Sequence, residues 1–278
     1  MLGAIIGDVI GSRFEWDNIK SKEFDLFNEE CEPTDDSFMT LAIEEAIMDN
    51  YPIDYSKEGL ERLKKSVINK MVKYYNDYPY AGYGGHFEEW CRSKEHLPYN
   101  SLGNGAGMRV SCVGWIANSI QEVKMLSNAV TEITHNHSEG LKGAESIAMC
   151  IYLARMGKSK QEIKEYVIDN YYPRLKDLNY DDLVKNYTYN VTAPFSTPEA
   201  IYCFLIANDF EDTIRNAISI GGDSDTIACM AGAIAEAYYG IPNSIINDLK
   251  KHLDPQIQFV IDIFYNFLKL TIEGISNR

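Results

Sequence analysis

The chain has 278 residues and carries 41 Asp and Glu against 26 Lys and Arg, which gives a formal charge of −15. Nonspecific binding of nucleic acid or of an anionic membrane requires clustered basic side chains, so this surplus of carboxylates argues against both. With 45% hydrophobic and 24% charged residues, the composition is that of a folded globular protein and excludes an intrinsically disordered one.

Cysteine use and hydropathy indicate a reduced, cytoplasmic protein with no membrane attachment. The six cysteines occur singly, without a C-x-x-C pair or a histidine at zinc-finger spacing. This spacing argues against a disulfide framework and against a structural zinc site. No apolar run approaches the roughly 18 residues of a membrane span, and the first apolar run is interrupted by Asp8.

The spacing of apolar residues predicts an all-α protein. Apolar residues recur mostly every three or four positions, and the best strand candidate, residues 187–191, is short. No linker, low-complexity tract or repeat divides the chain, so we predict a single domain over residues 1–278. The clearest predicted helices cover residues 38–49, 60–75, 140–156, 199–207, 223–239 and 256–270.

The first predicted helix is rich in glycine. Gly3, Gly7 and Gly11 are spaced by four residues, and a second run of small residues covers 228–235. Glycine in a helix interior costs about 0.5–1 kcal/mol relative to alanine, so three glycines on one face need a structural reason. We expect two central helices whose backbones approach closely, or one helix that packs against a ligand.

The first acidic motif is Thr34-Asp35-Asp36-Ser37, directly before the helix that starts near Phe38. Thr, Asp and Ser are preferred N-caps, and negative charge is favourable at a helix N-terminus, so capping accounts for one of these residues. It does not account for two adjacent carboxylates, which repel each other unless a proton or a cation lies between them.

The second acidic motif is Gly221-Gly222-Asp223-Ser224-Asp225-Thr226, again at the start of a helix. Oxygen ligands of this kind suit Mg²⁺, Mn²⁺ or Ca²⁺ rather than zinc. An EF-hand is excluded because the sixth and twelfth positions counted from Asp223 are Ala228 and Ile234. Either motif alone is better explained by capping, but two such motifs in one chain favour a two-metal site built from two helix N-termini.

Two more motifs lie between the acidic ones. Residues 98–109 form a glycine-rich loop, which is either an ordinary turn or a phosphate cradle made of backbone N–H groups. It lacks the Lys-Ser/Thr of a P-loop, and no strand precedes it. His135 and His137 precede a later helix, and no third His or Cys accompanies them, so a zinc role is not favoured.

Taken together and in this order, the motifs resemble the ADP-ribosylglycohydrolase family. The resemblance implies a compact orthogonal bundle of helices that holds two Mg²⁺ or Mn²⁺ ions, with ADP-ribose bound across them. The matching segments are residues 3–15, 34–37, 100–111, 134–144 and 220–240.

The resemblance also implies roles for individual residues. It implies proton transfer by Glu15 or Asp36, without assigning acid and base. The implied metal ligands are Thr34, Asp35, Asp36, Asp223, Asp225 and Thr226. The implied substrate-binding residues are Asn100, Ser101, Gly103, Asn104, Gly105, Met108 and His135.

The implied activity is metal-dependent release of ADP-ribose from a modified acceptor. Glu88 and Glu89 lie in an aromatic insert, residues 74–90, that suits a mobile lid or a surface patch. Their carboxylates suit a guanidinium, which favours mono-ADP-ribosylated arginine on protein, with an ADP-ribosyltransferase or toxin as counterpart. The alternatives are hydrolysis of serine-linked or O-acetyl-ADP-ribose, a non-catalytic ADP-ribose-binding or toxin-immunity protein, and a two-metal phosphohydrolase.

Overall fold

The computed structural model describes residues 1–276, with side chains as far as Thr271. Within that range the chain forms α-helices and two 3₁₀ turns, and no β-strand. The helices are α1 (Leu2–Gly11), α2 (Asp35–Asp49), α3 (Lys57–Asp77), α4 (Gly85–Arg92), α5 (Gly105–Arg109), α6 (Ser111–Ile116), α7 (Ile120–Thr131), α8 (Ser138–Arg155), α9 (Lys160–Asn170), α10 (Tyr180–Asn186), α11 (Ala193–Ile206), α12 (Phe210–Ser219), α13 (Ser224–Tyr239), α14 (Asn243–Leu249) and α15 (Pro255–Ser276), with 3₁₀ turns at Ser12–Phe14 and Pro173–Asp177.

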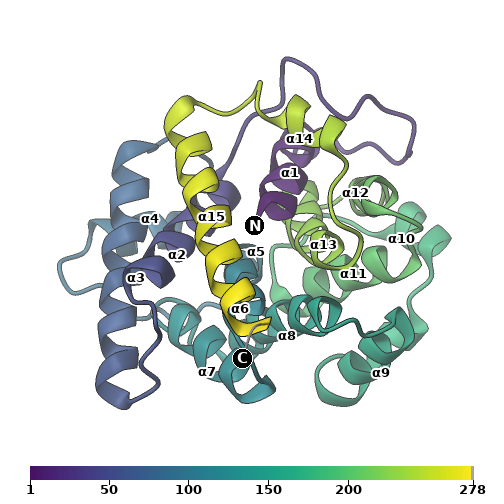
Figure 1. The fold of residues 1–278 in the computed structure, drawn as a ribbon. Coiled ribbons are helices and arrows are strands. Elements are labelled where there is room, and N and C mark those ends of the chain that lie inside the picture. Colours follow the sequence, from purple (N-terminus) through teal and green to yellow (C-terminus); the bar gives the residue numbers. More distant parts are fainter. Residues whose placement is uncertain (277–278) are drawn as a thin grey trace.

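The all-α prediction is confirmed, and the six periodic segments all lie in helices. α1 and α13 lie near the centre, α2 to α4 lie on one side of them, α8 to α12 on the other, and α15 crosses the front over α2 (Figure 1). The helix predicted at 199–207 begins earlier, at Ala193, and contains Pro198. Pro198 cannot donate to the carbonyl of Pro194, and the Arg174 side chain donates to that carbonyl instead, at 2.7 Å.

The best strand candidate, residues 187–191, does not form a strand. This segment is extended, but the only bridge in its vicinity among the described residues is an isolated pair, Gly103 with Thr192. The β-branched and aromatic residues of the segment have no second strand to pair with, because the neighbouring elements are a loop and helices.

The glycines of α1 allow its backbone to touch that of α13. A methyl group on Gly3 would lie 2.3 Å from the carbonyl oxygen of Gly232, and one on Gly7 would lie 2.1 Å from that of Ala228. One on Gly11 would lie 2.5 Å from the Cα of Asp225. The expected close approach of two central helices is therefore confirmed. It brings the last turn of α1 against the first turn of α13.

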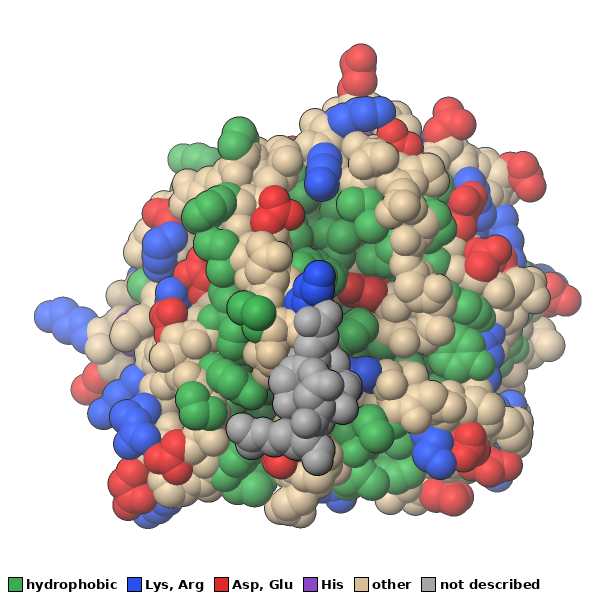
Figure 2. Space-filling view, in the orientation of Figure 1, with side chains coloured by type: hydrophobic (Ala, Val, Ile, Leu, Met, Phe, Trp, Pro, Cys, Tyr) green, Lys and Arg blue, Asp and Glu red, His purple; other side chains and the backbone are tan. Residues whose placement is uncertain are grey.

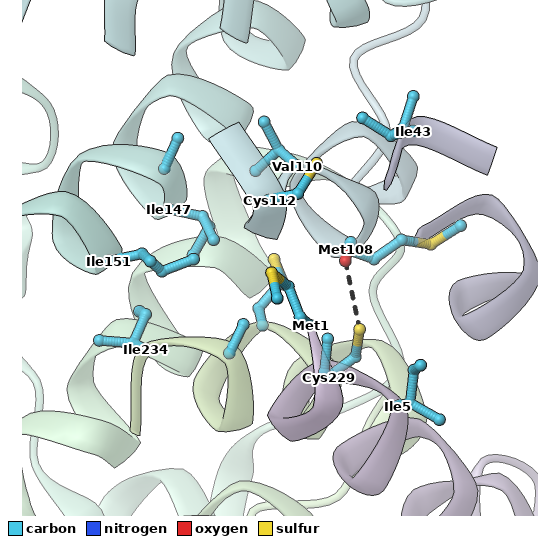
Figure 3. Close-up of a cluster of buried hydrophobic side chains, with 14 of the residues drawn as sticks. Met1, Ile5, Ile43, Met108, Val110, Cys112, Ile147, Ile151, Cys229 and Ile234 are labelled. Carbon is cyan, nitrogen blue, oxygen red and sulfur yellow. Dashed lines mark hydrogen bonds between the residues drawn. The ribbon is translucent and has the colours of Figure 1, made fainter. Parts of the chain in front are cut away.

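The core around these two helices also fixes α5 in place. Side chains from α1, α2, α5, α6, α8 and α13 meet in one buried cluster (Figure 3). Within it the Cys229 thiol donates to the carbonyl of Met108 at 3.3 Å, and the Thr40 hydroxyl donates to the same oxygen. All six cysteines are buried and none forms a disulfide.

The molecular surface is mixed in character. On the face that carries α15, hydrophobic side chains gather around a central hollow and most charged ones lie towards the rim (Figure 2). Over the part of the chain that the structure describes, every helix is too short or too polar to cross a lipid bilayer.

Candidate active site

Asp8, in the last turn of α1, holds the first acidic motif in place. Its Oδ1 accepts a hydrogen bond from the Thr34 hydroxyl at 2.6 Å, and its Oδ2 accepts from the N–H groups of Thr34 and Ser37 at 2.9 and 3.1 Å. The Ser37 hydroxyl also donates to Oδ2. Burial raises the pKa of Asp8 to about 6, although these hydrogen bonds lower it. Sequence reasoning missed Asp8 as a site residue.

The carboxylates at the start of α2 differ in exposure. Asp35 is partly exposed, and its N–H donates to the carbonyl of Ala81 at 2.7 Å. Asp36 is only 2% exposed. Its Oδ2 accepts from the Thr226 hydroxyl at 3.2 Å, while its Oδ1 has no hydrogen-bond partner among the described residues. Asp36 is thus a buried carboxylate with one oxygen left unpaired.

The first turn of α13 presents the second pair of carboxylates. Gly221 and Gly222 precede it with φ of 70° and 79°, a left-handed conformation that suits glycine. The Asp223 Oδ2 accepts from the side-chain amide of Asn104 at 2.5 Å. Asp225 is buried, and within the described chain nothing hydrogen-bonds to its Oδ1.

These carboxylates converge in two groups that share Asp225. Oxygens of Asp8, Asp36 and Asp225 lie within 4.8 Å of one another, and so do oxygens of Glu15, Asp223 and Asp225. Burial, and then the charge of neighbouring carboxylates, raises the pKa of Asp36 and of Asp225 well above the usual range. An oxygen-only donor set with unpaired buried oxygens fits a hard divalent cation.

The carboxylates border a cavity of about 310 Å³. All six predicted metal ligands line it, and so does Glu15. Six of the seven predicted substrate-binding residues line it as well. The exception is Asn100, which is exposed and whose N–H donates to the Asn136 side chain at 2.7 Å. Lining residues that the sequence analysis did not assign include Gly82, His86, Tyr99, Arg109, Tyr189 and Val191.

His135 lies on the side of the cavity formed by the glycine-rich loop. The Thr134 hydroxyl oxygen accepts from Arg109 at 2.6 Å and lies 2.8 Å from the His135 Nδ1. Burial and the charge of Arg109 lower the pKa of His135 well below its usual value, so the ring is neutral. The other ring nitrogen, Nε2, faces Gly103 and Gly105.

Glu15 lies at the rim of the same cavity. The Tyr189 hydroxyl donates to its Oε1 at 3.0 Å, and the Trp16 ring stacks on the Tyr189 ring with centroids 5.0 Å apart. Burial and then the charge of Asp223 raise the pKa of Glu15. Tyr189 belongs to the extended segment 187–191. The Asn104 N–H joins this segment to the glycine-rich loop by donating to the Val191 carbonyl at 2.9 Å.

Residues 1–269 match the ADP-ribosylglycohydrolase family. The chain belongs to that family. It is therefore a glycosidic-bond hydrolase that acts on ADP-ribose-bearing substrates, and its fold is that of the family. A solved structure titled "ADP-ribosylglycohydrolase-related protein complex" has the same fold, with a TM-score of 0.71 and 20% identity over 97% of this chain and 95% of the other.

Curated relatives match over most of their length. The ADP-ribosylhydrolase ARH3 of Mus musculus is 27% identical over 87% of this chain and 83% of its own, and that of Homo sapiens is 27% identical over 87% and 84%. The ADP-ribosylarginine hydrolase Tri1 of Pseudomonas putida is 23% identical over 87% of this chain and 70% of its own.

The aromatic insert, residues 74–90, is helical at both ends in this member of the family. Its ends lie in α3 and α4, and Tyr83, Phe87 and Trp90 are buried. Glu88 lies 3.3 Å from Arg92 in an ion pair, and neither Glu88 nor Glu89 lines the main cavity. These two carboxylates therefore give no support to arginine as the acceptor.

Proposed function

We propose that this protein is a metal-dependent hydrolase that removes ADP-ribose from mono-ADP-ribosylated arginine. The unpaired buried oxygens of two carboxylates are the main support for the metal dependence. Asp36 and Asp225 each have a buried, unpaired oxygen, and carboxylate oxygens of the two residues lie within 4.8 Å of each other. Two Mg²⁺ or Mn²⁺ ions, held by Thr34, Asp35, Asp36, Asp223, Asp225 and Thr226, would neutralise these carboxylates and polarise a water molecule there.

Asp8 acts in this proposal as a positioning residue. All its observed hydrogen bonds come from Thr34 and Ser37, so both its oxygens are engaged in holding the start of α2. The Thr34 hydroxyl donates its proton to Asp8 and accepts from the Asp36 N–H at 3.3 Å, which leaves one lone pair on its oxygen for a cation. Second-layer carboxylates of this kind orient ligands.

Glu15 is the favoured proton-transfer residue of the two predicted. Its Oε1 is fixed by Tyr189, its side chain is not fully buried, and its raised pKa brings it closer to neutral pH. Asp36 lies deeper, with one oxygen bound to Thr226 and the other unpaired in the carboxylate group. It suits a ligand better than a group that exchanges protons with water.

The opposite side of the cavity suits the pyrophosphate of ADP-ribose. The His135 Nε2 faces the loop, and buried Arg109 supplies a positive charge behind it. The same space is bordered by Ser101, Gly103, Asn104, Gly105 and Met108. Anions favour such groups of oriented donors. With its pyrophosphate here, the ribose of the substrate would reach the carboxylates.

Arginine is proposed as the acceptor because the Pseudomonas putida relative is named an ADP-ribosylarginine hydrolase. An ADP-ribosyltransferase or a toxin that modifies arginine would then be the counterpart of this enzyme. The names of the ARH3 relatives specify no acceptor.

The test is product analysis by mass spectrometry with an ADP-ribosyl-arginine peptide. We expect free ADP-ribose with Mg²⁺, no product with EDTA, and at least a 100-fold loss in Asp225→Ala. Asp181→Ala, an exposed aspartate in α10, is the matched control and should keep full activity. Unchanged release by Asp225→Ala would contradict the metal site. Release of phosphate would indicate a phosphohydrolase, and tight ADP-ribose binding without turnover would indicate a binding protein.

A further inference from the structure

A second groove, of about 600 Å³, opens directly from the carboxylate side of the main cavity. The two spaces share Glu15, Thr34 and Gly82 as lining residues. The groove continues past Trp16 to the loop between α3 and α4 and to the turn before α15. A long ligand that extends from the glycine-rich loop past the carboxylates would therefore continue from the main cavity into this groove.

The position of the groove determines which part of a substrate it meets. If the pyrophosphate lies on the loop side and the ribose on the carboxylates, the anomeric carbon points away from the loop. The bond that is cleaved joins this carbon to the acceptor. The acceptor must then lie beyond the carboxylates, where the main cavity meets the groove at Glu15 and Gly82.

The charge of the groove is negative. Besides Glu15, three carboxylates line it, and no Lys or Arg is among the described residues that do. Asp77 is paired with Lys73 at 2.8 Å, and Asp254 accepts from the Tyr78 hydroxyl at 3.0 Å. Glu32 is exposed and has no ion pair within the described residues. Glu32 is thus the carboxylate most available to a ligand.

Two large aromatic side chains stand at the edge of the groove. Trp16 is 79% exposed and Tyr80 is 99% exposed. Exposed aromatic rings beside carboxylates favour a cationic partner, because a guanidinium or ammonium group can stack on the ring and pair with the acid. Trp16 is also held in place by Tyr189, so it is already oriented before a ligand binds.

We propose that this groove binds the acceptor polypeptide and selects positively charged residues around the modified arginine. The proposal rests on the proposed function, because it takes the groove as the leaving-group side of the same reaction. Beyond the proposed function, it predicts a preference for the residues that flank the modified arginine, which cleavage of the bond itself does not require.

The test uses three peptides with the same ADP-ribosylated arginine, flanked by Lys, by Ser or by Glu. We expect KM to be lowest with Lys and highest with Glu, and added salt to reduce the difference. Glu32→Gln should raise KM for the Lys-flanked peptide about threefold, in the range of one exposed ion pair. Trp16→Ala should raise it for the Lys- and Ser-flanked peptides. Glu29→Gln, an exposed neighbour outside the groove, is the control and should keep the ranking.

Two results would overturn the groove assignment. One is an equal KM for the three peptides. The other is an effect of Glu32→Gln that is as large for free ADP-ribosyl-arginine, which has no flanking residues, as for the Lys-flanked peptide. If no substrate is hydrolysed, the proposed function fails, and equilibrium binding of the unmodified peptides then tests the groove. Binding of the Lys-flanked peptide that Glu32→Gln weakens would support it, and equal or absent binding would contradict it.

Discussion

Gly7 and Asp8 are adjacent in α1, yet they meet two very different surroundings. Gly7 lies against the backbone of α13 in a contact that leaves no room for a methyl group. Asp8 faces the start of α2, in a group of buried carboxylates that repel one another. The interface between α1 and α13 is closely packed and needs no ligand. The carboxylate group one residue away keeps unpaired buried oxygens. The interface stabilises the fold and holds in place a cluster that needs a cation.

The largest effect is expected from Gly7→Val. Its side chain would meet the backbone of Ala228, which cannot move without displacing α13, so the free energy of unfolding should fall by more than about 3 kcal/mol. Urea unfolding measures the change. Gly84→Val is the control, because a methyl group on Gly84 has no neighbour within 4 Å, and it should change stability by about 0.5 kcal/mol or less. Comparable losses for the two variants would contradict the packing argument.

In the absence of metal, Asp36→Asn should raise the free energy of unfolding, whereas Gly7→Val lowers it. The raised pKa of Asp36 means that its charge destabilises the folded state increasingly as pH rises. In EDTA at neutral pH, the variant should therefore be more stable than the wild type. Saturating Mg²⁺ should stabilise the wild type, by about 2.7 kcal/mol at one hundred times Kd, and the variant much less. Urea unfolding with EDTA and with Mg²⁺ measures both differences.

The matched control for this comparison is Asp181→Asn, an exposed aspartate in the first turn of α10. It should respond to Mg²⁺ as the wild type does. A variant Asp36→Asn that is less stable than the wild type in EDTA would show that this carboxylate is not strained in the metal-free protein.

The helices were predictable because their signals are local. Periodic apolar residues placed the long helices, and the spacing of Gly3, Gly7 and Gly11 predicted a close helix contact without naming the partner. Residues 187–191 have the local preferences of a strand, but a strand needs a neighbour, and the fold provides only the bridge of Gly103 to Thr192. Tertiary context decided against the local preference there.

The site was predictable where two motifs coincide with helix N-termini, and less so elsewhere. Asp8 was visible only as a charge inside an apolar, glycine-rich helix, and that mismatch is the signal that a buried partner exists. Tyr189 and Gly82 come from loops, and their place beside the carboxylates depends on how distant elements pack. No local pattern in the chain encodes that packing.

The smallest effect at pH 5 is expected at Glu44, a buried carboxyl group of α2 that does not line the cavity. Burial raises its pKa from 4.5 to about 8. The folded protein therefore keeps a proton that the unfolded chain releases, so the stability that Glu44 contributes is full below about pH 4.5 and is lost as pH rises through about 8. Because Gln resembles the protonated form, Glu44→Gln should become more stable than the wild type as pH rises from 5 to 8, with the smaller difference at pH 5.

The neighbouring Glu45→Gln separates this effect from a general change in α2. Glu45 pairs with Lys70 at 2.7 Å and accepts from the Tyr74 hydroxyl at 2.9 Å, so its substitution should lower stability at pH 5 and at pH 8 alike. Mg²⁺ should not change the effect of Glu44→Gln, since this carboxyl group lies outside the metal cluster. A difference between Glu44→Gln and the wild type that does not change with pH would contradict the raised pKa of Glu44. If Mg²⁺ changed the difference between Glu44→Gln and the wild type, the bound cation would affect the charge of Glu44 as well as that of the site carboxylates.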